Sequence, residues 1–157
     1  YCDHEVKSMD NPRPSDIEND PFDGALVRRF LESMPIFQLY GAKVIGFTRG
    51  TSELEIPWRR DLTFDGKTIQ AGVSASLMDF AGGSAVATML PIDQGIMTTG
   101  FEVHNTAPAV GDRLIAIGQA VHMGKRTGVG RADVYVERDG ERTLCATGLV
   151  SIQSFKI

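Results

Sequence analysis

The longest apolar stretch of the chain runs from Gln70 to Pro91 and carries a single charged residue, Asp79. Ala, Gly, Ser, Val, Leu and Met occupy every side of a helical wheel there, which predicts a helix buried on nearly every face. Gly72 offers a start for this helix and Pro91 a stop. A carboxylate in such surroundings is costly unless it is paired, hydrogen-bonded or protonated. Asp79 is therefore the leading candidate for a functional residue.

The segments around this helix show the patterns of other elements. Phe22–Ser33 has apolar residues at helical spacing and predicts a short amphipathic helix that ends near Met34–Pro35. Alternating patterns and turn residues, with Asp139–Gly140 the strongest hairpin signal, predict strands. The predicted strands are residues 41–49, 51–56, 96–105, 112–123, 127–138 and 142–152.

The order of these elements predicts an α+β fold, in which one curved antiparallel sheet wraps around the long apolar helix. A single sheet cannot cover every side of so apolar a helix, so we expect a second copy of the chain to cover the rest. The expected assembly is a homodimer, with a dimer of dimers as the alternative. A transmembrane span is the other interpretation of the apolar stretch, and the mid-stretch Asp79 argues against it.

Composition narrows the class of protein. A chain of 157 residues predicts one domain, here residues 22–157, preceded by an arm at residues 1–21 that is rich in Asp, Asn, Pro and Ser. The net charge of −4 gives no reason to expect binding to nucleic acid or to an anionic membrane. Cys2 and Cys145 lie at opposite ends and form neither a disulfide framework nor a metal-binding spacing. With no signal peptide in view, we expect a reducing, cytoplasmic location.

Several motifs, taken in order, resemble the hotdog-fold thioesterases of the phenylacetate-pathway (PaaI-like) group. The opening Gln70-Ala71-Gly72, followed by apolar residues and Leu77-Met78-Asp79, is similar to the start of that family's central helix. The resemblance covers about Tyr40–Ile152. It continues through Thr98–Thr99, Pro108–Ala109, Gly111–Asp112 and Gly124–Thr127.

The resemblance implies a hotdog fold and an acyl-CoA thioesterase that needs no cofactor beyond the coenzyme A of its substrate. Asp79 would act as general base or nucleophile, and the Gly72 N–H at the helix N-terminus would polarise the thioester carbonyl. Gln70 and one of Thr98 and Thr99 would complete the catalytic group. Gly72 and Asp79 are seven residues apart, about 10 Å along a helix, so we expect each site to combine Gly72 of one subunit with Asp79 of the other.

Basic residues supply candidates for the coenzyme A phosphates. Gly124, Lys125, Arg126 and Thr127 form the first group, because Lys and Arg donate strongly to phosphate, and Arg59 with Arg60 forms a second. His104 and His122 lack the companions of a zinc site, so no metal is expected. Cys145, within a strand, is expected in the core.

Each of these roles has a structural alternative. Asp79 could be a buried, hydrogen-bonded carboxylate, Gly72 a helix-start glycine, and Thr98 and Thr99 ordinary strand residues. Lys125–Arg126 could be a solvated turn. Ala71 replaces a glycine of the family pattern, and Phe64–Asp65 stands where many relatives have Asn. These departures favour the alternative function, a non-catalytic acyl-CoA-binding or sensing protein.

Overall fold

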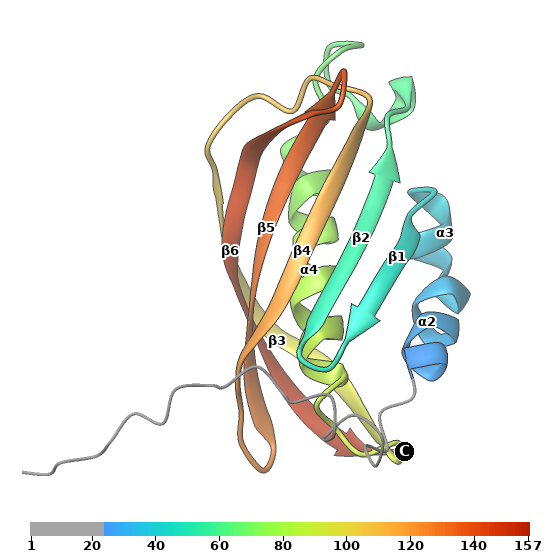
Figure 1. Ribbon diagram of the computed structural model, residues 1–157, viewed down its shortest axis with the longest axis vertical. Helices are drawn as coiled ribbons and strands as arrows, with labels where there is room; N and C mark the ends of the chain where they lie inside the picture. The colour runs from blue at the N-terminus through green and yellow to red at the C-terminus, as the bar shows by residue number, and fades with distance from the viewer. Residues whose placement is uncertain (1–23) are drawn as a thin grey trace, which may run out of the picture.

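The computed structural model describes residues 24–157 (Figure 1). The predicted N-terminal arm, residues 1–21, lies outside the described residues. The helices are α2 (Gly24–Ser33), α3 (Pro35–Leu39), the 3₁₀ turn η1 (Arg60–Leu62) and α4 (Ala71–Ala87). The strands are β1 (Lys43–Thr48), β2 (Thr51–Pro57), β3 (Gln94–Asn105), β4 (Arg113–Met123), β5 (Thr127–Arg138) and β6 (Glu141–Lys156).

The strands form a six-stranded antiparallel sheet in the order β1-β2-β4-β5-β6-β3. The sheet curves around α4, and α2 and α3 lie beyond β1 at the side of the molecule (Figure 1). Strand β3 follows α4 in the chain but pairs with β6, so it forms the edge of the sheet opposite β1. The predicted α+β fold with a curved sheet around one long helix is confirmed.

Helix α4 touches the sheet backbone directly, because glycines stand at the contact points. A Cβ atom added at Gly118 of β4 would lie 2.2 Å from the Ala81 carbonyl oxygen, and one at Gly130 of β5 would lie 2.2 Å from the Gly82 carbonyl oxygen. Ser52 of β2 donates its hydroxyl to Ala81 O over 2.7 Å within the core. These contacts fix α4 against the middle of the sheet.

Helix α4 is shorter than the sequence predicted and ends at Ala87 rather than near Pro91. Thr88 is the C-cap, and its hydroxyl donates to the Ala85 carbonyl over 2.6 Å while accepting the Gly50 N–H at 2.6 Å. The turn between β1 and β2 therefore helps to terminate the helix, a long-range contact that the local sequence does not indicate.

Two other elements differ from the prediction. Helix α2 ends at Ser33 as expected, but Pro35 then begins the five-residue helix α3 instead of only ending a helix. Proline suits the first position of a helix because it has no N–H to leave unpaired there. Strand β6 runs to Lys156, beyond the predicted end at residue 152, because β3 pairs with it along the extra length.

No helix within residues 24–157 combines the length and the apolar character that crossing a membrane requires.

The glycine contacts predict that an added methyl group destabilises the fold at Gly130 and not at Gly46. Gly130→Ala should lower the free energy of unfolding by about 1–3 kcal/mol, because the new Cβ meets backbone that cannot move aside cheaply. Gly46→Ala is the matched control, since a Cβ at that strand position meets nothing within 4 Å. Urea denaturation measures both. Equal losses for the two variants would contradict the proposed close contact between α4 and β5.

Candidate active site

Asp79 lies in the middle of α4, where the edge strand β3 reaches the helix. The helix residues before and after it are largely buried, whereas Asp79 itself is half-buried. Its carboxylate oxygen Oδ1 accepts a hydrogen bond of 2.8 Å from the Thr98 hydroxyl of β3. The structure therefore joins two of the residues that the sequence analysis selected, although they are 19 positions apart.

The surroundings of Asp79 shift its acidity. Burial raises the pKa of the Asp79 carboxyl above its usual range, and the hydrogen bond from Thr98 opposes that rise. Within residues 24–157, no Lys, Arg or His forms an ion pair with Asp79. A carboxylate that is partly desolvated and held by one hydroxyl is a stronger base than one in water, which suits proton abstraction.

A β-bulge decides which of the two predicted threonines reaches Asp79. The pairing of β3 with β6 matches Thr98 to Ile152 and Gly100 to Ser151, which leaves Thr99 as the extra residue. Thr98 faces α4, whereas Thr99 is exposed and donates its hydroxyl to the Ser151 carbonyl over 3.2 Å. Of these two threonines, it is Thr98 that donates a hydrogen bond to the carboxylate.

The N-terminus of α4 is capped by Gln70. The side-chain oxygen of Gln70 accepts the N–H of Gly72, so the N–H proposed to polarise a carbonyl already has a partner. Ala71 and Gly72 are exposed. Within one chain Gly72 and Asp79 lie two helical turns apart, so the described residues do not bring these two groups to one point.

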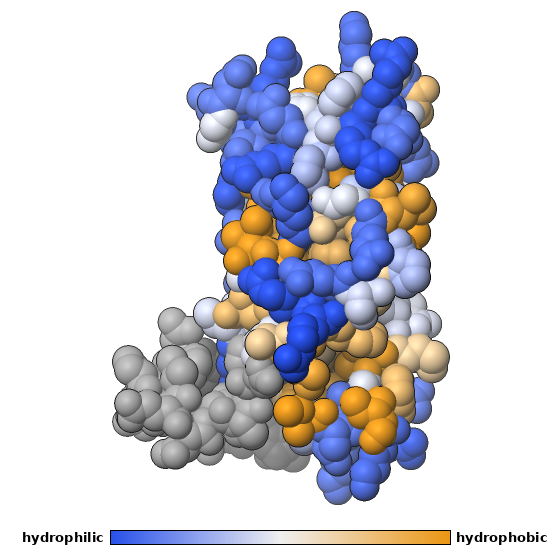
Figure 2. Space-filling model, turned by 90° about the vertical axis from the view of Figure 1, so that its right-hand side faces the viewer, coloured by the Kyte–Doolittle hydropathy of each residue, from blue (hydrophilic) through white to orange (hydrophobic). Residues whose placement is uncertain are grey.

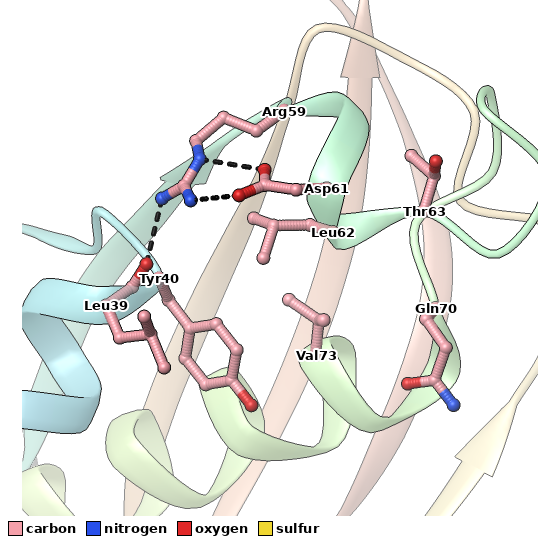
Figure 3. A pocket seen from close by; sticks show the side chains of 8 residues that line it. All are labelled: Leu39, Tyr40, Arg59, Asp61, Leu62, Thr63, Gln70 and Val73. Carbon is pink, nitrogen blue, oxygen red and sulfur yellow. Dashed lines mark hydrogen bonds and ion pairs between the residues drawn. The ribbon is translucent and has the colours of Figure 1, made fainter.

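A cavity of about 390 Å³ opens beside this N-terminus (Figure 3). Arg59 is engaged there, because it donates to both carboxylate oxygens of Asp61, at 3.1 and 2.5 Å, and to the Leu39 carbonyl at 2.8 Å. These bonds tie the end of α3 to the loop after β2. The side chains of Tyr40 and Val73 form part of the apolar wall of the cavity (Figure 3).

The Gly124–Thr127 turn lies at the other end of α4. It joins β4 to β5 at the lower end of the molecule in Figure 1, whereas Arg59 and Arg60 lie at the upper end, where α4 begins. The Gly124 N–H donates to Thr127 O over 2.8 Å, and the exposed side chains of Lys125 and Arg126 make no ion pair within the described part of the chain. The two basic groups are therefore separated by the length of the helix.

Histidine and cysteine have other surroundings. His104 lies 2.9 Å from the Glu102 carboxylate on an exposed part of β3, and residues 24–157 contain no group of three or more side chains that could hold a metal ion. Cys145 is buried, as expected, and burial raises the pKa of its thiol to about 11. A thiol with so high a pKa stays protonated and is a poor nucleophile at neutral pH.

An apolar cavity adjoins Asp79, at a place that the sequence motifs did not indicate. It has a volume of about 180 Å³ and lies between α2, α4 and β3, with Asp79 and Thr98 in its wall. The sequence carried one signal for it, the apolar side of the helix predicted at residues 22–33. That signal did not reveal that this side would face the carboxylate, because the contact depends on the tertiary fold. The apolar side chains of this wall are Val27, Phe30, Leu31, Met34, Phe80 and Ile96.

Comparisons with known proteins identify the family of the chain. A family model described as the thioesterase superfamily matches residues 66–143. A protein of Halobacterium salinarum named as a candidate esterase is 31% identical in an alignment of 140 positions that covers 84% of this chain and 92% of that relative. The crystal structure of a thioesterase family protein from Silicibacter pomeroyi is 27% identical, has a TM-score of 0.80, and is matched over 84% of this chain and 97% of that chain.

The PaaI-like group is not singled out among these relatives. The E. coli PaaI protein of the phenylacetic acid degradation operon has a TM-score of 0.72 at 19% identity, over 85% of this chain and 91% of that chain. A thioesterase from Haemophilus influenzae has a TM-score of 0.75 at 16% identity, over 86% of this chain and 92% of that chain. At these identities the likeness establishes the hotdog fold alone.

The contact between Thr98 and Asp79 predicts a measurable titration. In Thr98→Val the carboxylate loses the hydrogen bond that stabilises its charged form, while burial remains, so the pKa of Asp79 should rise further. Titration of the Asp79 carboxyl ¹³C signal by NMR, assigned with Asp79→Asn, measures the shift. Thr99→Val is the control and should leave that pKa in place. A pKa that is unchanged or lower in Thr98→Val would contradict the geometry.

Proposed function

Since the chain belongs to the thioesterase superfamily, we propose that it hydrolyses acyl-CoA thioesters with Asp79 as the working carboxylate. The observation that carries this proposal is the surroundings of Asp79: a half-buried carboxylate, held by Thr98, at the wall of an apolar cavity. An apolar acyl group in that cavity would bring its thioester carbonyl to the carboxylate.

Two chemical routes are open to Asp79. As a general base it takes a proton from a water molecule whose oxygen adds to the carbonyl carbon; the C–S bond then breaks, and the thiolate of coenzyme A accepts a proton. As a nucleophile it attacks the carbonyl carbon itself; the C–S bond breaks, coenzyme A leaves as a thiolate that accepts a proton, and water hydrolyses the acyl-enzyme anhydride that remains. Both routes need the ionised carboxylate, so turnover should fall as the pH drops through the raised pKa of Asp79.

The charge that develops on the carbonyl oxygen needs a donor, and we assign that role to Gly72 of a second copy of the chain. Two features support a homodimer: β3 is an unpaired edge strand within the described sheet, and the strip of α4 around Asp79 is only half covered. A dimer of dimers would extend the same arrangement. In this proposal the Gln70 side chain releases the Gly72 N–H when substrate binds, and its amide contacts the carbonyl region.

We assign coenzyme A binding to the Gly124–Thr127 turn. The side chains of Lys125 and Arg126 are exposed and form no ion pair within residues 24–157, so their donors are available to phosphate. Arg59 has less to offer because Asp61 and Leu39 already engage it, and Arg60 remains a secondary candidate. A PaaI-like branch and a cytoplasmic location are part of the proposal, supported by the Gln70–Asp79 motif and the free thiol of Cys145.

One alternative function has a specific observation in its favour. The bond from Gly72 N–H to Gln70 occupies the donor that hydrolysis requires, and Asp65 is used in a turn, where its carboxylate accepts the N–H groups of Lys67 and Thr68. A chain with both features could bind acyl-CoA without hydrolysing it. Turnover by the wild-type protein separates this binder from the enzyme.

Asp79→Asn tests the catalytic role directly. The variant keeps the shape of the side chain but loses the basic oxygen, so hydrolysis should slow by at least about 100-fold, the low end for loss of a general base. A neutral amide is cheaper to bury than a carboxylate, so the fold should persist. Thiol release from a panel of acyl-CoAs measures the rate, and thermal unfolding checks the fold.

The outcomes of this experiment separate the interpretations. Near-normal turnover of a folded Asp79→Asn variant would reduce Asp79 to a structural role. Binding of several acyl-CoAs by the wild type, with no hydrolysis of any, would establish the non-catalytic alternative instead. Asp93→Asn, an exposed carboxylate outside the site, is the matched control and should keep the wild-type rate.

The assignment of Lys125 and Arg126 predicts a selective loss of affinity. Changing both to Ala should raise the KM for an acyl-CoA several-fold more than the KM for the same acyl group on N-acetylcysteamine, which lacks the nucleotide and its phosphates. Steady-state kinetics with the two substrates measures the ratio. Equal changes in the two KM values would assign the segment to a solvated turn.

A further inference from the structure

A second apolar cavity adjoins the one beside Asp79, farther along α4. Each has a volume of about 180 Å³, and both are lined by Val27, Phe30, Ala87 and Ile96. The first chamber contains Asp79. The second extends toward the end of the chain, where its walls include Leu26, Leu90, Pro91, Ile92, Phe155 and Ile157. The shared residues form a waist between the two chambers.

We propose that these two chambers form the acyl-binding channel and that the substrate is a straight, medium-length acyl chain. This inference rests on the proposed thioester hydrolysis, because it takes Asp79 as the point where the carbonyl lies. The chain would run from Asp79 through the waist into the second chamber. Ala87, the last residue of α4 and the smallest side chain at the waist, sets the length that the channel admits.

The polarity of the first chamber favours an apolar occupant. Its polar groups other than the carboxylate already have partners: the Thr98 hydroxyl donates to Asp79, and the Ser84 hydroxyl donates to the Ala81 carbonyl over 3.2 Å. A hydroxylated or charged acyl group would find no free partner beyond Asp79 and would lose its hydration. An alkyl chain has no polar group whose hydration would be lost, and it gains contacts with the apolar wall.

The size of the channel favours a chain over a ring. An apolar cavity of about 150 Å³ accepts benzene, so each chamber has room for about six carbons. An aromatic acyl group would fill the first chamber and leave the second empty, whereas a chain of about eight to twelve carbons would occupy both. Figure 2 shows apolar residues at the surface in the middle and lower parts of this face, above a hydrophilic lower tip.

Helix α2 gives the channel a fixed outer wall. Arg28 of α2 donates to the Val44 carbonyl of β1 over 3.0 Å and pairs with Glu32 at 3.3 Å, while Leu31 is buried. These contacts hold the apolar side of α2 over α4. Phe30 is 59% exposed, so the wall is closed more loosely at the waist than at Leu31.

The other large cavities fit this role less well. The cavity at the N-terminus of α4 has Arg59, Asp61, Thr63 and Gln70 in its wall and does not reach Asp79. The cavity beside Cys145 and Ala107 also lies away from the carboxylate. Ala107 is half-buried like Ala87, so it offers a matched position for adding bulk to a competing cavity.

The experiment measures binding and turnover against chain length. Non-hydrolysable thioether analogues of acyl-CoA with two to sixteen carbons are titrated into the wild type, Ala87→Leu and Ala107→Leu by calorimetry. In the wild type, each added methylene should tighten binding up to roughly fourfold until about twelve carbons. In Ala87→Leu that gain should stop near six carbons, whereas Ala107→Leu should follow the wild-type profile.

Phe30→Ala gives a second readout at an exposed position, in case Ala87→Leu fails to fold. Opening the waist should improve binding of branched chains relative to straight ones. The inference is overturned if Ala87→Leu and the wild type have the same length profile, if Ala107→Leu shortens the profile, or if Phe30→Ala leaves the branched-to-straight ratio unchanged.

Failure of the inference is distinguishable from failure of the proposed function. Length-dependent binding that Ala87→Leu cuts short, without hydrolysis of the corresponding thioesters, would support the channel and overturn the thioesterase. Hydrolysis that depends on Asp79 but ignores the size of residue 87 would support the thioesterase and overturn the channel.

Discussion

The close contact between the backbone of α4 and the glycines of β4 and β5 determines where everything else in the site can lie. Gly118 and Gly130 admit the carbonyls of Ala81 and Gly82 at distances that any side chain would block. At 100° per residue, Asp79 projects about 200° away from Ala81, on the opposite side of the helix. The contact that buries one side of α4 therefore turns the carboxylate away from β4 and toward the edge strand β3.

The side of α4 that carries Asp79 combines a charge with apolar surroundings. Thr98 reaches the carboxylate because the bulge after it leaves Thr99 unpaired with β6, and the apolar side of α2 closes the space beyond. A carboxylate there is desolvated enough to be a stronger base, yet it keeps one hydrogen bond that stabilises its charge. The same surroundings that raise its pKa are those that an acyl chain would fill, which joins the proposed chemistry to the proposed substrate.

Much of the fold could be predicted from local patterns. The turn at Asp139–Gly140 has both residues at positive φ, 52° and 81°, as the two-residue hairpin signal predicted, and the order of helices and strands followed from periodicity. Asp79 could be selected from the sequence because a carboxylate in an apolar helix is costly unless it is paired, hydrogen-bonded or protonated. Its contact with Thr98 could be suspected only through the family resemblance, since no local rule joins residues 19 positions apart.

The features that sequence could not supply all depend on tertiary contacts. Thr88 ends α4 early because the turn at Gly50 binds its hydroxyl, and the apolar side of α2 becomes a cavity wall only when α2 packs over α4. The bond between Gln70 and Gly72 is local, but a glutamine cap is a weak signal beside Ser, Thr, Asp and Asn. That the two basic groups lie at opposite ends of α4 could not be predicted locally, because it depends on the path of the whole chain.

The most direct measurement is a crystal structure of the protein with a non-hydrolysable thioether analogue of a ten-carbon acyl-CoA. We expect the sulfur end of the acyl chain to lie beside the Asp79 carboxylate, the chain to pass Phe30 and Ala87, and Gly72 of a second copy to face the same point. An acyl chain in the cavity of Tyr40 and Val73, or one that nowhere approaches Asp79, would contradict this expectation.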